Sequence, residues 1–114
     1  MNIEQIIKEL NLALLTKNKN FSEIVPSGGY TSDLLSCVMA GAPHNGLWVT
    51  LQAHANIVAV AALLELSAVI ITEGSAPDQA TIDKANEENI TLLATSQKSY
   101  FIVGKLWDMG IKEA

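Results

Sequence analysis

The segment from Gly46 to Gly74 constrains the fold of this chain more than any other stretch of its sequence. Its pattern predicts a strand, a short polar loop, a helix and a second strand in succession. The predicted helix, Asn56 to Leu66, is apolar around almost its whole circumference. A helix on the surface of a small domain normally has a single apolar stripe. We therefore expect this helix to be covered by its own sheet and also by a partner chain.

Strand and helix patterns alternate along the rest of the chain. Apolar residues spaced three and four apart predict further helices at 1–10, 78–88 and 97–109. Another predicted helix begins after an N-cap at Thr31 or Ser32 and ends near Gly41. Short apolar or alternating runs predict strands at 11–15, 21–25, 47–51, 68–72 and 91–94. This alternation predicts a three-layer α/β fold, with a mainly parallel sheet flanked by helices. The length of 114 residues predicts a single domain, 1–114.

The composition points to burial between chains. Hydrophobic residues make up 49% of the sequence and charged residues only 17%, although a small domain has much surface to cover. We therefore predict a homodimer. The formal net charge is −5, and the chain has no arginine. Such a chain lacks the basic surface that nucleic-acid backbones require, so we expect no nucleic-acid partner.

No feature of the sequence predicts export or membrane insertion. The start of the chain lacks the basic and small-residue pattern of a signal peptide. The longest apolar run, Ile57 to Leu64, is too short to cross a bilayer. The single cysteine, Cys37, rules out an internal disulfide framework. We therefore expect a cytoplasmic protein that does not contact a membrane.

Polar loops follow the predicted parallel strands, and in open parallel sheets ligands bind at these carboxyl ends. The first loop carries paired glycines, which let a backbone approach a ligand, and it leads into a helix N-terminus, which favours anions. The first interpretation of each of these loops is a simple turn or cap, and a binding site is the second. The candidate ligand-binding residues are Gly28, Gly29, Thr31, Ser32, His54, Asn56, Thr72 and Gly74.

The sequence predicts neither catalysis nor metal binding. Cys37, His44 and His54 do not have the spacing of metal ligands. Cys37 lies on the predicted apolar stripe of its helix, so we expect a buried structural cysteine. No nucleophile, base and orienting group come together, and no phosphate-binding P-loop is present. We predict a protein that is not an enzyme and has no cofactor; an enzyme using His54 or Cys37 is the weakest of the hypotheses.

Several short blocks together resemble a DRTGG domain over most of the chain, from about Asn11 to Met109. Ala53 and His54 occupy the positions of the D-R pair that gives the family its name. Thr72 and Gly74 match the T-G-G element, and Glu73 replaces its middle glycine. The blocks that carry the resemblance are 28–36, 47–52, 56–61, 70–74 and 77–78.

The resemblance implies a fold like that of the amino-terminal domain of HPr kinase, not of its catalytic domain. It also implies a non-catalytic regulatory and dimerisation module, with a small anionic ligand such as a nucleotide at the strand-end loops. The alternative is a ligand-free partner of a kinase, phosphatase or redox enzyme encoded nearby. The sequence leaves open whether the changes at Ala53, His54 and Glu73 abolish ligand binding.

Overall fold

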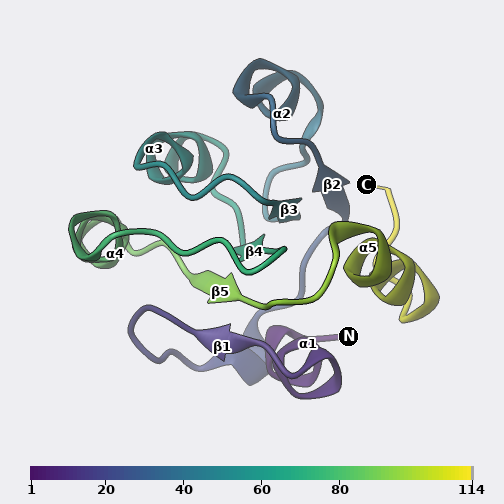
Figure 1. Cartoon of the computed structure of the whole chain (residues 1–114). Coiled ribbons are helices and arrows are strands. Elements are labelled where there is room, and N and C mark those ends of the chain that lie inside the picture. Colours follow the sequence, from purple (N-terminus) through teal and green to yellow (C-terminus); the bar gives the residue numbers. More distant parts are fainter. Residues whose placement is uncertain (114) are drawn as a thin grey trace.

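A five-stranded sheet forms the middle layer of the computed structural model, which describes residues 1–113 (Figure 1). The strand order is β1-β5-β4-β3-β2, and every neighbouring pair is parallel except β1 with β5. The mainly parallel sheet that the alternating pattern predicted is therefore confirmed. The strands are β1 (Ala13–Leu14), β2 (Gly29–Thr31), β3 (Leu47–Thr50), β4 (Ala68–Ile71) and β5 (Leu92–Ala94).

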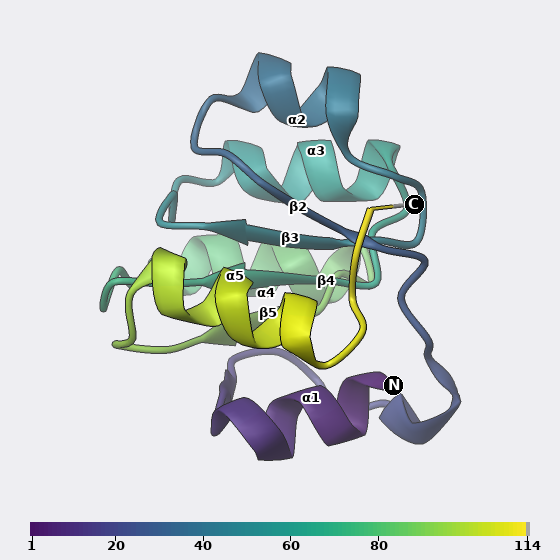
Figure 2. The same cartoon turned by 90° about the vertical axis from the view of Figure 1, so that its right-hand side faces the viewer.

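Helices cover both faces of the sheet (Figures 1 and 2). On one face lie α2 (Leu35–Gly41), α3 (Asn56–Leu63) and α4 (Gln79–Glu87). On the other face lie α1 (Ile3–Leu10) and α5 (Ser99–Asp108). The molecule thus has the three layers expected from the sequence.

The two central strands explain why the core has two halves. All residues of β3 and β4 are buried, because helices cover both of their faces. Successive side chains of a strand point to opposite faces. Trp48 accordingly packs with the α2, α3 and α4 side, while Leu47 and Val49 pack with α1 and α5.

The apolar helix α3 is buried largely by its own chain. Ile57, Val58, Val60 and Ala61 are all buried against the sheet and the neighbouring helices. Its open side chains include Ala59 and Leu63. The prediction that the sheet covers α3 is confirmed. The prediction that a partner chain covers its exposed side stays a proposal.

The strand predicted at 21–25 is wrong. Phe21–Glu23 forms a short 3-10 helix, η1, and Phe21 is buried in the core. The strand of this region is instead β2, in the segment predicted to be a glycine loop. β2 has little apolar patterning of its own and exists because it pairs with β3, with Gly29 beside Leu47. As an edge strand it tolerates a glycine more readily than a central strand would.

The apolar spacing in α2 predicts a buried stripe of Leu34, Leu35, Val38 and Met39, and this prediction is only partly confirmed. This helix begins at Leu35 without a side-chain cap, and Val38 is its buried residue. Leu34 and Met39 are exposed, and so is Cys37, which was expected to be buried. The reason is position: α2 lies at the outer edge of its layer, beside α3 and the edge strand β2, so only a narrow side of it faces the core (Figure 1).

The stripes of the last two helices are also narrower than their apolar residues predict, which are Ala80, Ile82 and Ala85 in α4 and Ile102, Val103, Leu106 and Trp107 in α5. In α4 the buried residues are Thr81 and Ala85, whereas Ala80, predicted to be buried, is exposed. In α5 the buried residues are Ile102 and Leu106, and Trp107 is exposed. The sequence predicts Gly110 as the stop of this last helix, and Gly110 follows α5 with a positive φ of 96°, the conformation such a stop adopts. In the described part of the chain, no helix has both the length and the apolar character needed to cross a membrane.

Candidate functional site

The carboxyl ends of the four parallel strands meet at one edge of the sheet, and the loops that follow them lead into α2, α3, α4 and α5 (Figure 2). We call this region the carboxyl edge; it comprises residues 31–34, 50–56, 72–78 and 95–99. Six of the eight candidate residues lie here: Thr31, Ser32, His54, Asn56, Thr72 and Gly74.

The paired glycines lie at the opposite end of β2. The Gly28 carbonyl oxygen accepts a hydrogen bond from the Leu47 N–H (2.8 Å), at the start of β3. The Gly29 N–H donates to the Lys112 carbonyl oxygen (2.8 Å). Both glycines are therefore engaged in holding the edge strand, and the structure does not bring them together with the other candidates.

Asp33 joins the first two loops of the carboxyl edge. One of its carboxylate oxygens accepts hydrogen bonds from the Thr50 hydroxyl (2.8 Å) and from the Leu51 N–H (2.9 Å). Nearby, the Thr31 hydroxyl donates to the Val49 carbonyl oxygen (2.8 Å). These contacts tie the end of β2 to the end of β3, so Thr31 already has a structural partner.

Ser32 shapes the turn before α2 without capping that helix. Its hydroxyl oxygen accepts a hydrogen bond from the Leu34 N–H (3.1 Å), and its carbonyl oxygen accepts one from the Trp48 indole N–H (2.9 Å). The predicted N-cap at Thr31 or Ser32 is wrong, because the capping position belongs to Leu34. The buried Trp48 thus satisfies its polar atom at the carboxyl edge.

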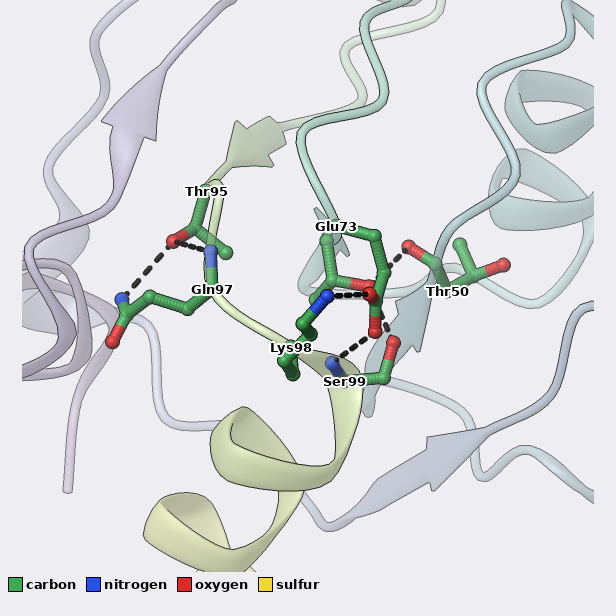
Figure 3. Close-up of polar contacts among 7 residues, drawn as sticks. Thr50, Glu73, Thr95, Gln97, Lys98 and Ser99 are labelled. Carbon is green, nitrogen blue, oxygen red and sulfur yellow. Dashed lines mark hydrogen bonds and ion pairs between the residues drawn. The ribbon is translucent and has the colours of Figure 1, made fainter.

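A carboxylate from the end of β4 caps α5 (Figure 3). One Glu73 oxygen accepts a hydrogen bond from the Ser99 N–H (2.8 Å), and the other lies 3.5 Å from the Lys98 ammonium nitrogen. A carboxylate is favoured at a helix N-terminus, where backbone N–H groups lack partners. The bond from the Ser99 N–H, together with the positive charge of Lys98, lowers the pKa of Glu73 below its ordinary value.

The same junction is closed further by Thr72, which is completely buried. Its hydroxyl hydrogen-bonds with the Ser99 hydroxyl and lies 3.3 Å from the Thr50 carbonyl oxygen. The backbone N–H groups of Glu73 and Gly74 donate to carbonyl oxygens of the 95–97 loop, at 2.9 Å and 3.1 Å. The β4 and β5 ends are thereby held together by groups of this chain alone (Figure 3).

The N-terminus of α3 is much more open. Its capping residue is Ala55, which supplies no side-chain hydrogen bond. The His54 Nδ1 accepts a hydrogen bond from the Asn56 N–H (3.1 Å), and both side chains are exposed. Since Nδ1 is the acceptor, a neutral His54 carries its proton on Nε2, where it can donate to a bound group.

Carboxylates outnumber ammonium groups at this edge. Asp33 and Glu73 are joined by Asp78, which caps α4 by accepting a hydrogen bond from the Thr81 N–H (2.9 Å). The hydrogen bonds from Thr81 lower the pKa of Asp78. Each carboxylate therefore has local donors. At the start of α3 the backbone N–H groups of Asn56, Ile57 and Val58 also have partners within the loop, so what remains open there is the pair of exposed side chains of His54 and Asn56.

A cavity of about 420 Å³ lies beside the fourth loop of the carboxyl edge. Thr95, Ser96 and Gln97 form part of its wall, and Phe101 and Lys105 of α5 form another part. This volume is within the range of small-molecule sites. Lys105 also lies over the Phe101 ring, 5.7 Å from its centroid. Among residues 1–113, no group of three or more His, Cys, Asp or Glu side chains is placed to hold a metal ion.

Sequence analysis missed the contacts that organise this edge, made by Asp33, Thr50, Glu73, Lys98 and Ser99. The sequence contained one sign that Glu73 has a special role, because this glutamate stands where the DRTGG pattern has a glycine. In the structure Glu73 adopts a positive φ of 63°, a conformation that favours glycine. No local pattern indicates that Ser99 and Lys98 would meet it, because that contact depends on the strand order.

Comparison with solved structures identifies the architecture. The chain is similar to the crystal structure of the CBS and DRTGG domains from the regulatory region of a Clostridium perfringens pyrophosphatase, complexed with its activator diadenosine tetraphosphate. The TM-score is 0.73 at 19% sequence identity. The chain has a DRTGG-like fold. The match covers 90% of this chain and 44% of the pyrophosphatase chain, so the present protein spans less than half of that neighbour. Protein-family models and curated proteins give no match.

Proposed function

We propose that this DRTGG-like chain is a non-catalytic, homodimeric regulatory module that binds a small anionic ligand, such as a nucleotide, at the carboxyl edge. The observation that carries the proposal is the convergence of six candidate residues at that edge, next to the N-terminus of α3, where the side chains of His54 and Asn56 are exposed. The regulatory region of the structurally similar pyrophosphatase was crystallised with a nucleotide activator, diadenosine tetraphosphate, which supports a nucleotide as the ligand of this chain.

The residues of the edge divide into two roles under this proposal. Thr31 and Thr72 donate within the chain and hold the loops in place. His54 and Asn56 are exposed at the first turn of α3, where backbone dipoles favour an anion. Ser32 and Gly74 would border the ligand, and Gly28 and Gly29 would act at a distance by fixing β2.

A thermal-shift screen tests the ligand proposal directly. Diadenosine tetraphosphate, ATP, AMP and inorganic phosphate are each titrated against the whole chain. A ligand present at 100 times its Kd stabilises the protein by about 2.7 kcal/mol, which raises the Tm. If none of these compounds raises the Tm, the ligand proposal is wrong.

Two variants test where the ligand binds, and a third variant serves as a matched control. His54→Ala should reduce the shift if the ligand sits at α3, and Lys105→Ala should reduce it if the ligand fills the cavity by Phe101. His44→Ala is the control, because His44 is also exposed but precedes β3 at the other end of the sheet and pairs with Glu65. Equal loss in all three variants would contradict a site at the carboxyl edge.

A ligand-free interaction module is the second candidate. The observation that favours it is the row of exposed aromatic side chains on α5, namely Tyr100, Phe101 and Trp107. Such residues are enriched where proteins meet. In this case the partner would be a kinase, phosphatase or redox enzyme, and no nucleotide would change the Tm. We also propose a cytoplasmic location, because the exposed free thiol of Cys37 suits a reducing compartment.

A further inference from the structure

The cavity of about 420 Å³ beside the fourth loop of the carboxyl edge is lined by three parts of the chain that are distant in sequence. They are the end of α1 with the start of β1, the end of β5 with the loop after it, and one side of α5. Figure 2 shows α1 and α5 on the same face of the sheet. We call this space the α1/α5 cavity; its lining residues are 9–11, 13, 94–97, 101 and 105.

Gln97 fixes one wall of the α1/α5 cavity. Its side-chain nitrogen, Nε2, donates hydrogen bonds to the Leu10 carbonyl oxygen (2.9 Å) and to the Thr95 hydroxyl oxygen (3.0 Å; Figure 3). The end of α1 is thereby held against the loop after β5. Because these two contacts account for both N–H groups of the amide, the side chain has only its oxygen, Oε1, left to offer. Among residues 1–113 no donor reaches this acceptor.

One carboxylate and one ammonium group border the same cavity. Glu9 lies in the last turn of α1, and Lys105 lies on α5, with its nitrogen 5.7 Å from the centroid of the Phe101 ring. No ion pair within residues 1–113 includes Glu9 or Lys105, so two opposite charges share the cavity without pairing. The C-terminus of α1 adds to the contrast, because its last carbonyl groups favour a positive charge.

We propose that the α1/α5 cavity binds a free amino acid with an apolar side chain. The ammonium group of such a zwitterion would meet Glu9, the Gln97 Oε1 and the end of α1, and its carboxylate would meet Lys105. A phosphate would face the Glu9 carboxylate, and a simple amine would face the Lys105 ammonium group. The Phe101 ring, which is 45% exposed, provides an apolar wall for the side chain of the ligand.

A series of small ligands tests whether both charges are recognised. L-Leucine, L-methionine and L-phenylalanine are each titrated against the whole chain, up to millimolar concentrations, and calorimetry measures the Kd. Leucinamide lacks the carboxylate and N-acetyl-leucine lacks the ammonium group. Each derivative should bind about 10-fold more weakly than leucine, because it loses one charge-assisted contact. If none of the three amino acids binds, the proposal is wrong. Equal binding of leucine and both derivatives would contradict recognition of a zwitterion.

Variants of the two charged residues test the place of binding. Glu9 and Lys105 are exposed, so Glu9→Gln and Lys105→Ala should fold, which circular dichroism verifies. Lys105→Ala should raise the Kd of leucine about 10-fold and leave that of leucinamide unchanged, because leucinamide has no carboxylate to lose a partner. Glu9→Gln should weaken leucine similarly and leave N-acetyl-leucine unchanged. Lys84→Ala is the matched control, because Lys84 is an exposed lysine of α4, on the other face of the sheet.

The outcomes separate this cavity from the anionic-ligand site proposed above. If leucine binds and neither Lys105→Ala nor Glu9→Gln weakens it, the α1/α5 cavity is not the amino-acid site. If Lys105→Ala removes the nucleotide shift and no amino acid binds, the cavity belongs to the anionic ligand; the proposed function then stands and this inference is wrong. If leucine binds as expected and no nucleotide raises the Tm, the amino-acid site stands without the anionic ligand.

Discussion

The N-termini of α3 and α5 lie at the same edge of the sheet but are completed in different ways. At α5 the chain supplies a carboxylate from another strand end, Glu73, and a buried hydroxyl, Thr72. At α3 the capping position is an alanine, and the nearest polar contact comes from His54 within the same loop. The junction at α5 is therefore closed by the protein itself, whereas α3 is positioned by apolar packing and its first turn stays open to a partner.

The strongest test of this contrast removes packing from α3. Ile57 is completely buried, at the first turn of the helix. Ile57→Ala should lower the free energy of unfolding by about 2–5 kcal/mol, because it leaves a cavity in the core. Asn56→Ala, at the exposed neighbouring position, should change it by less than about 0.5 kcal/mol. Urea denaturation measures both values. A small effect of Ile57→Ala would show that apolar packing does not hold α3.

The next test removes the buried hydroxyl from the α5 junction. Thr72→Val keeps the shape of the side chain but deprives the Ser99 hydroxyl of its partner. The expected loss is about 0.5–1.5 kcal/mol, the net contribution of a typical hydrogen bond, because Ser99 itself is only partly buried.

A second buried threonine provides the matched control for Thr72. The Thr91 hydroxyl has no hydrogen-bond partner in the described part of the chain. Thr91→Val should therefore be neutral or stabilising, as measured by the same urea titration. Equal destabilisation by the two substitutions would mean that the Thr72 contact contributes nothing specific.

The ionisation of Glu73 gives a pH-dependent test of the closed junction. The Ser99 N–H and Lys98 favour the charged carboxylate, so the pKa of Glu73 in the folded state lies below its ordinary value of 4.5. The stabilisation is thus fully present above that value and is lost as the pH falls through the lower folded-state pKa. Glu73→Gln should be less stable than the wild type at neutral pH, and the difference in Tm should shrink on acidification. A difference that is constant with pH would contradict the capping role.

The same contrast marks what sequence analysis could predict. The apolar runs of β4 and α3 identify buried elements, because a continuous apolar segment must be removed from water whichever elements pack against it. Trp48 was expected in the core or at an interface, and it is buried in the core. Where a fold is dictated by continuous apolar segments, the sequence alone is sufficient.

Elements whose state depends on distant neighbours were predicted poorly. β2 is a strand because β3 pairs with it, and Gly29, Tyr30 and Thr31 give no local sign of that. Cys37 is exposed because α2 sits at the outer edge of its layer, which depends on the strand order. The contact of Glu73 with Ser99 likewise needs β4 and β5 to be neighbours.

The smallest expected effect concerns His54, and it decides whether α3 is open. His54→Ala removes an exposed acceptor from the Asn56 N–H. We expect the free energy of unfolding to change by less than about 0.5 kcal/mol, as for most surface substitutions. Hydrogen exchange of the Asn56 amide should become faster, while that of the Ser99 amide, capped by Glu73, should not change. If His54→Ala destabilised the protein as much as Thr72→Val, the α3 junction would also be closed by polar contacts. The first turn of α3 would then no longer be the place where an anionic ligand can reach exposed side chains without breaking a structural contact.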